Sequence, residues 1–419
     1  MSIRKRVFNL AFIGDRHQQE KVIKTLMERN LQEKLKVERK LAATPHSYVI
    51  NNLSNGVKPV MSLIRTPGSL RYTKNILTGC MIADYTVLVL TLTPAVLDNP
   101  IAALKAQMKY FKMCEFLRVL QKPVSLIILH EVDGTAGEAQ GRKLTKEELD
   151  VLKSELKAHI EQSGVLQAFN MLYYPSSYST MVLENFVLQE ILTEKEIVKP
   201  DSRDSNGIFT SPMALEGGSE NLLAKKKGKL AVLKAYKNYE TNRLILISKV
   251  ISGSLEPYSL TKYKISNNFD KFFRFEDIEI GWKRVAKAVA GELVSLSFVD
   301  PSTYPFFLKK AIVYEGDQDW DDCFEKGVVM ADVRVHLFKG GARNIQEGTR
   351  FTIHYCMVNT GVQVQEVLEV INEEVVLLKL NLRNNLIQES LNCLTLGHFA
   401  VMQGRDLVGY GDVTKVYIP

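Results

Sequence analysis

Near the N-terminus, a glycine that follows a short apolar run could begin a phosphate-binding loop. The apolar run covers residues 7–13, Gly14 follows it, and a helical pattern of apolar residues begins around Lys21. A loop of the form Gly-x-x-x-x-Gly-Lys-Ser/Thr uses glycines to let backbone N–H groups approach phosphates, a lysine to neutralise them and a hydroxyl to hold Mg²⁺. A strand, a loop and a helix are therefore expected in this order.

Only the first glycine of that motif is present. The second glycine position holds Gln19, the lysine position holds Glu20, and the hydroxyl position holds Lys21. A carboxylate that faces a triphosphate repels it. A register shifted by one residue would make Lys21 the phosphate lysine, but it would place Glu20 at the glycine position and Val22 at the hydroxyl position. The sequence therefore favours a loop that does not grip phosphate, with the shifted register as the alternative.

The first 195 residues alternate strand-like apolar runs with helical patterns. The run 85–92 is continuously apolar and rich in β-branched residues, which is typical of a strand buried on both faces. A helix should start near Thr145, where the sequence Thr-x-Glu-Glu has the form of a capping box. This alternation predicts a doubly wound parallel sheet. The other expected strands are 7–13, 60–64 and 123–129, and the other expected helices are near 21–26, 72–81, 101–120 and 180–193.

A change of composition separates this region from the rest of the chain. Residues 196–229 are rich in Pro, Gly, Ser and Asn and show no sustained apolar period, which indicates a linker. From Leu230 onward the apolar runs are short and often alternating, which predicts antiparallel strands. Two antiparallel β-barrels would account for them, because closure removes exposed sheet edges. The predicted domains are 1–196, a linker 197–229, 230–322 and 323–419.

Bulk composition is that of a soluble protein with several domains. The chain has 419 residues, 46% hydrophobic and 24% charged, and we expect it to contain neither a signal peptide nor a membrane span. Five scattered cysteines and histidines without ligand spacing predict no disulfide framework and no metal site, and they suit the cytoplasm. The net charge of +7 fits a polyanionic partner such as RNA, although many proteins with this charge bind no nucleic acid.

The segment 64–90 closely resembles the stretch of elongation factor 1-alpha that runs from its Asp-x-Pro-Gly motif into the following strand. Segments 251–260, 276–298 and 394–416 are similar to elements of the two β-barrels of that factor. The chain thus resembles the translational GTPases, and 347–371 resembles the release-factor and ribosome-rescue branches at least as well. The resemblance implies a degenerate G domain followed by two β-barrels. The residues matched in the first segment are Pro67, Gly68, Lys74, Asn75, Thr78, Gly79, Ala83, Asp84, Val87 and Leu88.

The resemblance assigns a metal position and a water position in that same segment. Active relatives use Asp-x-Pro-Gly-His, in which the aspartate reaches Mg²⁺ through water and the histidine positions the attacking water. The chain has Arg65 at the aspartate position and Ser69 at the histidine position, with Gly68 retained. Both functional side chains are absent, so the resemblance implies no hydrolysis.

The guanine-binding positions are also altered. The motif Asn-Lys-x-Asp corresponds to His130, Glu131, Val132 and Asp133. Asp133 could still accept from the guanine ring, but a lone Asp after a strand is more often a turn or helix cap. Ser176 lies near the expected base-edge loop and is equally well explained as a loop serine.

Candidate contacts with partners lie beyond the G-like region. Lys225, Lys226 and Lys227 precede the first predicted barrel, and Trp282 lies in a loop that resembles a partner-contacting loop. A solvated linker and ordinary packing are the respective alternatives. The resemblance, together with the altered positions, implies a ribosome-associated pseudo-GTPase that binds ribosomal RNA, a tRNA or release-factor-like protein, or both, without a cofactor, a metal or a membrane. The alternatives are a slow GTP-binding factor that uses Lys21 and Asp133, and an RNA-decay adaptor that acts through the barrels.

Overall fold

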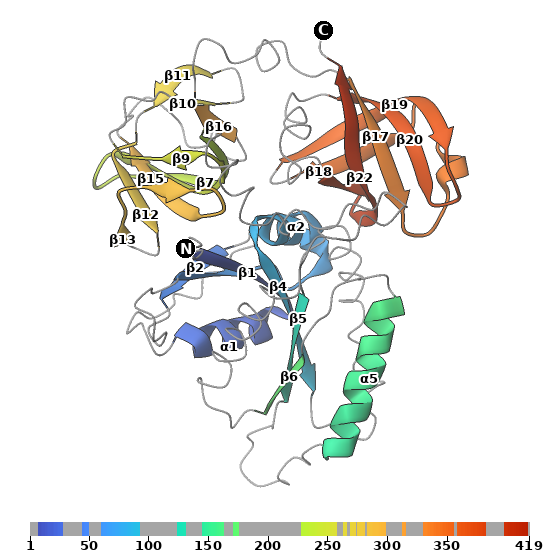
Figure 1. Cartoon of the computed structure of the whole chain (residues 1–419), viewed down its shortest axis with the longest axis horizontal. Helices are drawn as coiled ribbons and strands as arrows, with labels where there is room; N and C mark the ends of the chain where they lie inside the picture. Colours follow the sequence, from blue (N-terminus) through green and yellow to red (C-terminus); the bar gives the residue numbers. More distant parts are fainter. Residues whose placement is uncertain are drawn as a thin grey trace, which may run out of the picture. The chain divides into compact units, whose positions relative to one another are not determined.

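The structure is a computed structural model, and it forms two compact units, one built around a parallel sheet and one that contains antiparallel sheets (Figure 1). In the part of the chain that it describes, no helix combines the length and the apolar character needed to cross a bilayer. The described residues are 7–27, 44–49, 60–92, 124–130, 145–162, 171–175, 228–257, 263–265, 269–273, 275–280, 283–298, 312–315, 330–355, 358–382 and 398–417.

The first unit contains the predicted doubly wound sheet. Its strand order is β2-β3-β1-β4-β5-β6, and β1, β4, β5 and β6 pair in parallel. Because β3 and β4 lie on either side of β1, the order reverses at β1, and such sheets bind ligands beyond the carboxyl ends of the strands at this point. The strands are β1 Val7–Gly14, β2 Thr44–Val49, β3 Val60–Arg65, β4 Tyr85–Leu92, β5 Val124–His130 and β6 Met171–Pro175.

The core of this sheet lies along its central strands. Residues 10–13 of β1 and 87–90 of β4 are all at most 2% exposed, as expected of strands covered on both faces. Asp84, just before β4, accepts hydrogen bonds through Oδ2 from the backbone N–H and the side-chain Nδ2 of Asn9, at 3.0 and 2.9 Å. This buried carboxylate therefore holds the start of β4 against β1.

The described helices of this unit are α1 Arg16–Met27, α2 Thr73–Ile82 and α5 Lys146–Gln162, with a 3-10 helix at Leu70–Tyr72. The predicted capping box is confirmed: Thr145 Oγ1 accepts from the Glu148 N–H at 3.2 Å, and Glu148 Oε2 accepts from the Thr145 N–H at 2.9 Å. The predicted strands and the helix at 72–81 are also confirmed. The helices expected at 101–120 and 180–193 lie outside the described residues.

The second unit contains an eight-stranded antiparallel sheet of order β11-β10-β16-β7-β8-β15-β12-β13, beside a small sheet of β9 and β14. Phe275 and Phe298 meet edge to face in its core, with ring centroids 6.2 Å apart. The strands are β7 Lys229–Asn238, β8 Arg243–Ser252, β9 Ser254–Leu255, β10 Tyr263–Ile265, β11 Phe269–Phe273, β12 Asp277–Ile280, β13 Lys283–Arg284, β14 Ala288–Val289, β15 Leu293–Phe298 and β16 Ile312–Glu315.

The remaining strands close into a six-stranded barrel of order β17-β20-β19-β18-β21-β22, in which β22 pairs back onto β17. Alternate residues of β17 and β20 are buried, so one face of each strand fills the interior. The strands are β17 Met330–Leu337, β18 Arg350–Tyr355, β19 Val358–Val370, β20 Val375–Leu382, β21 His398–Gln403 and β22 Asp406–Tyr417. Antiparallel structure after Leu230 was predicted and is confirmed.

The predicted domain limits remain predictions. Residues 197–227 of the predicted linker, and the predicted barrel boundary near Asp322, lie outside the described residues. Strand β7 begins at Lys229, the last residue that the sequence assigns to the linker.

Candidate nucleotide site

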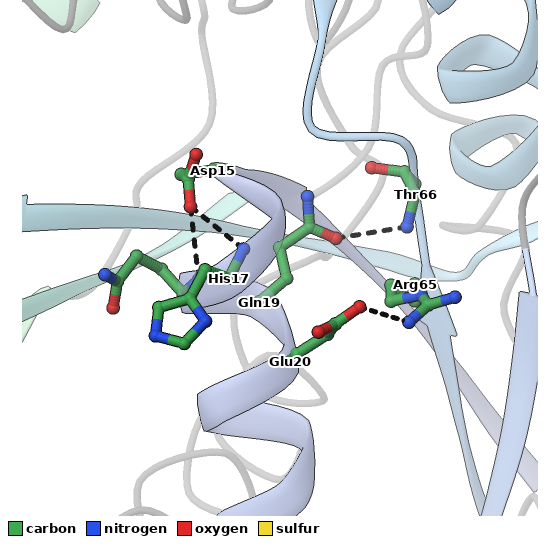
Figure 2. Close-up of polar contacts among 7 residues, drawn as sticks. Asp15, His17, Gln19, Glu20, Arg65 and Thr66 are labelled. Atoms are coloured by element: carbon green, nitrogen blue, oxygen red, sulfur yellow. Dashed lines mark hydrogen bonds and ion pairs between the residues drawn. The ribbon is translucent and has the colours of Figure 1, made fainter. Parts of the chain in front are cut away.

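Helix α1 begins almost directly after β1, so the predicted loop is absent. Only Asp15 separates Gly14, the last residue of β1, from Arg16, the first residue of α1. Asp15 caps the helix: its Oδ1 accepts from the backbone N–H groups of His17 at 2.9 Å and Gln18 at 3.4 Å (Figure 2). Aspartate is among the best N-cap residues. The expected loop up to Lys21 is therefore wrong, because Asp15 starts the helix five residues earlier.

The early helix start changes what the backbone can offer to a phosphate. A phosphate-binding loop presents several N–H groups that have no partner within the chain. In this chain the Gln19 N–H donates to the Asp15 carbonyl at 2.9 Å, and the N–H groups of His17 and Gln18 face the Asp15 carboxylate. A helix N-terminus attracts anions, and Asp15 supplies an anion from the chain itself.

Gln19 stands at the second glycine position and joins α1 to the ends of two strands. Its side chain is fully buried, its Nε2 donates to the Gly14 carbonyl at 2.7 Å, and its Oε1 accepts from the Thr66 N–H at 3.1 Å (Figure 2). Thr66 Oγ1 in turn donates to the Phe12 carbonyl at 2.6 Å. These bonds fix the chain that leaves β3 against the carboxyl end of β1.

Glu20 and Arg65 form an ion pair beside Gln19. Arg65 Nη1 donates to Glu20 Oε1 at 2.5 Å, and the two side chains are only 10% and 23% exposed, respectively (Figure 2). The sequence resemblance predicts Glu20 at the position of the phosphate-binding lysine and Arg65 at that of the metal-linked aspartate, and these assignments stay predictions. In the structure the two opposite charges satisfy each other through a charge-assisted hydrogen bond.

Solved structures of translation factors share this architecture. A bacterial selenocysteine-specific elongation factor, EF-Sec, matches with a TM-score of 0.62 and 16% identity over 98% of this chain and 58% of that chain. Translation elongation factor SelB from Methanococcus maripaludis, in complex with the GTP analogue GppNHp, matches with a TM-score of 0.63 and 11% identity over 99% of this chain and 80% of that chain. This is the fold of the translational GTPases.

The GTPase-like domain of Ski7 from S. cerevisiae, bound to GTP, has the same fold, with a TM-score of 0.63 and 10% identity over 98% of this chain and 97% of that chain. The chain spans 58% of the length of the EF-Sec chain. No protein-family model and no curated protein matches the sequence. The predicted resemblance to translational GTPases is confirmed at the level of the fold.

The described residues of the predicted site lie at the start of α1, in the turn after β3 and at the end of β5. Lys21 is exposed on α1. Gly68 and Ser69 lie in the turn between β3 and the 3-10 helix, where the Ser69 carbonyl accepts from the Tyr72 N–H at 2.9 Å and Ser69 Oγ accepts from the Arg71 N–H at 3.4 Å. Ser69 therefore caps a turn.

The guanine side of the site is described only in its backbone. His130 is the last residue of β5 and is paired in register with Leu92 of β4, which places it at the carboxyl edge of the sheet. Asp133, Ser176, the lysines Lys225 to Lys227 and Trp282 lie outside the described residues. No group of three or more metal-binding side chains occurs in the described part of the chain.

The sequence indicated roles in the candidate site for Glu20 and Arg65, but not for Asp15 and Thr66. Gln19 was interpreted only as a lost glycine. An available signal was Asp15 itself, which directly follows Gly14 and precedes residues without glycine or proline, as an N-cap does. In the described part of the site, the Asp15 cap, the buried Gln19 amide and the Glu20–Arg65 ion pair lie at the start of α1 and the end of β3.

Proposed function

We propose that this chain is a translation-factor-like binding protein that docks without a GTP-driven switch. The observation that carries the proposal is the combination of an Asp15 cap and a Glu20–Arg65 ion pair at the place where GTP phosphates and Mg²⁺ would lie in a working site. Three groups would have to reorganise before a triphosphate could enter, and each reorganisation costs free energy that binding must offset.

Electrostatics supports this part of the proposal. A triphosphate would meet the carboxylates of Asp15 and Glu20, and Mg²⁺ would meet the guanidinium of Arg65. Breaking the ion pair to admit a phosphate would separate Glu20 from Arg65 in a partly buried place, and separating such a pair is costly. The Arg65 charge could attract a phosphate on its own, but Glu20 already neutralises it at 2.5 Å.

The proposed partners are the ribosome and its RNA, together with a carried tRNA or release-factor-like protein. The translation-factor fold and the net charge of +7 support this choice, because a basic protein associates readily with a polyanion. A protein that docks without a switch should bind equally well whichever guanine nucleotide is present.

Co-sedimentation with purified ribosomes tests the docking. The full chain is pelleted with ribosomes at low salt with no nucleotide, with GDP or with GppNHp, and a GppNHp-dependent translation factor serves as the positive control. We expect the same pelleted fraction in all three conditions and a loss of pelleting as salt rises, because phosphate contacts are screened. A chain that stays wholly in the supernatant at low salt would refute the ribosomal partner.

A slow GTP-binding factor is the second candidate. The specific observation in its favour is that two solved structures of this fold carry GTP or GppNHp, one of them described as only GTPase-like. This candidate predicts that GppNHp increases ribosome pelleting and that Asp133→Ala abolishes the increase. An RNA-decay adaptor, in contrast, would not be retained on ribosomes.

A further inference from the structure

Strand β19 of the closed barrel is much longer than the strand beside it. It has 13 residues, whereas β18 has 6, and their pairing covers only 358–363. Gly348 and Thr349 extend this pairing to Val364 through two backbone hydrogen bonds of 2.8 Å. Residues 365–370 then pair with β20 alone, up to Val370 opposite Val376. Among the described residues, no strand lies along their other edge.

This edge also carries an exposed apolar cluster. Leu368, Val370 and Ile371 are 40%, 40% and 45% exposed, although the same strand buries Val362 and Val364 to 3% or less. In the described part of the chain seven large hydrophobic side chains are exposed, and three of them lie within residues 368–371. Such clustering of exposed apolar side chains is typical of a surface that binds another protein.

Carboxylates surround the cluster. Glu366, Glu369, Glu373 and Glu374 are all exposed, and the Lys379 Nζ lies 2.6 Å from Glu366 Oε2. That hydrogen bond raises the pKa of Lys379. The edge is therefore acidic in a chain of net charge +7. Nucleic acid would be repelled here, because its phosphates would face four carboxylates.

We propose that residues 365–370 of β19 bind an extended segment of a partner protein, rich in alternating basic and apolar residues, as an additional β-strand. Strand addition uses the free backbone groups of a sheet edge for affinity and the side chains on either face for specificity. The glutamates select a basic segment, and the apolar cluster selects alternating aliphatic residues. This proposal does not rest on the state of the nucleotide site.

Pairing with a second copy of the chain fits the edge poorly. Two copies would place their own glutamates opposite each other, and like charges in facing positions destabilise paired strands. The strand also has bulges between Val364 and Glu366 and between Val367 and Glu369. Bulges twist an edge and disfavour the long, flat pairing that two copies of this strand would need.

The first test uses a fluorescein-labelled peptide of about eight alternating lysine and valine residues, long enough to pair along this edge. We expect saturable binding to the full chain by fluorescence anisotropy. Binding should weaken roughly tenfold or more in the Glu366→Lys, Glu369→Lys double variant, because two attractive charges become repulsive. The matched control is Glu240→Lys with Asp406→Lys, the same charge change at two exposed positions elsewhere. No binding, or equal weakening in the control, would overturn the proposal.

A charge-reversed peptide guards against a variant that fails to fold. A peptide of alternating glutamate and valine should bind the Glu366→Lys, Glu369→Lys variant better than it binds the parent chain. A variant that binds neither peptide, yet retains the unfolding transition of the parent, would count against the proposal.

Backbone methylation separates strand addition from simple charge attraction. Successive backbone N–H groups of a strand point to opposite edges, so two lysine-valine peptides are made with N-methyl groups on alternate residues, in the two opposite phases. One of the two methylated peptides should bind about tenfold or more weakly, because its methyl groups replace the N–H groups that would bond to β19. The other should bind nearly as well as the unmethylated peptide, because its methyl groups point away from β19. Equal binding of both phases would show that no strand forms.

Discussion

Among single residues, the proposal for the nucleotide site depends most on the ion pair between Glu20 and Arg65. The types of these residues could be predicted from the sequence to disable a nucleotide site, but their pairing could not. They are 45 positions apart and lie on a helix and a strand end. The folding of α1 against the end of β3 brings Arg65 Nη1 and Glu20 Oε1 to 2.5 Å from each other. The two charges that the sequence predicts to disfavour GTP are thus complementary to each other.

The Glu20–Arg65 pair should contribute measurably to stability. With both side chains mostly buried, we expect the coupling energy in a double-mutant cycle of Glu20→Ala and Arg65→Ala to be about 1–2 kcal/mol, above that of exposed pairs. Urea unfolding of the four proteins measures it. The exposed neighbour Lys21→Ala is the control and should change the free energy of unfolding by less than about 0.5 kcal/mol. A coupling indistinguishable from zero would show that the pair is not formed.

At the level of secondary structure, the clearest sequence patterns predicted their strands and helices correctly. Strand 85–92 was predicted to the residue, because its continuous apolar run has no competing interpretation. The start of α5 followed from its capping box. Strands β2 and β6 were missed: TPHSYV and MLYYP are short and contain proline, so their strand form depends on neighbours in the sheet. The start of α1 was predicted near Lys21, as a phosphate-binding loop would require, whereas the Asp15 cap starts the helix at Arg16.

The cap at Asp15 makes a prediction of its own. Asp15→Ala should lower the free energy of unfolding by about 1 kcal/mol, because the N–H groups of His17 and Gln18 lose their acceptor. Asp15→Asn should lower it less, since an amide oxygen can still accept. Thermal unfolding by circular dichroism measures both. Equal losses in the two variants would argue that attraction between the Asp15 charge and the helix N-terminus, and not the capping hydrogen bonds, governs this position.

Two glycines of the closed barrel should respond differently to the same substitution. A Cβ at Gly411 of β22 would lie 2.5 Å from Cζ of Phe399, whose ring is fully buried, whereas a Cβ at Gly361 of β19 meets no atom within 4 Å. Gly411→Ala should therefore cost about 1–3 kcal/mol through overpacking, and Gly361→Ala should be neutral or slightly stabilising. Chemical denaturation measures the free energy of unfolding of both variants. Equal values would contradict the close packing of β22 on β21.

At the level of the whole molecule, the chain has the fold of the translational GTPases, within which we propose that the phosphate site does not admit GTP. Identities of 10–16% to solved translation factors accompany TM-scores of 0.62–0.63. Apolar periodicity and turn residues specify such a fold, and they survive changes that remove a catalytic group. The parallel sheet followed by antiparallel sheets could therefore be predicted from the sequence, whereas the contacts among Asp15, Gln19, Glu20 and Arg65 could not.

We propose that the side chains of Asp15, Glu20 and Arg65 close this site to GTP. A fluorescence titration of the full chain with mant-GTP in Mg²⁺ buffer measures whether they do, with Glu20→Ala and Asp133→Ala as comparison variants. We predict no saturable binding up to about 1 mM, equivalent to less than about 4 kcal/mol of binding free energy. Saturable binding at micromolar mant-GTP that Asp133→Ala weakens would contradict the claim.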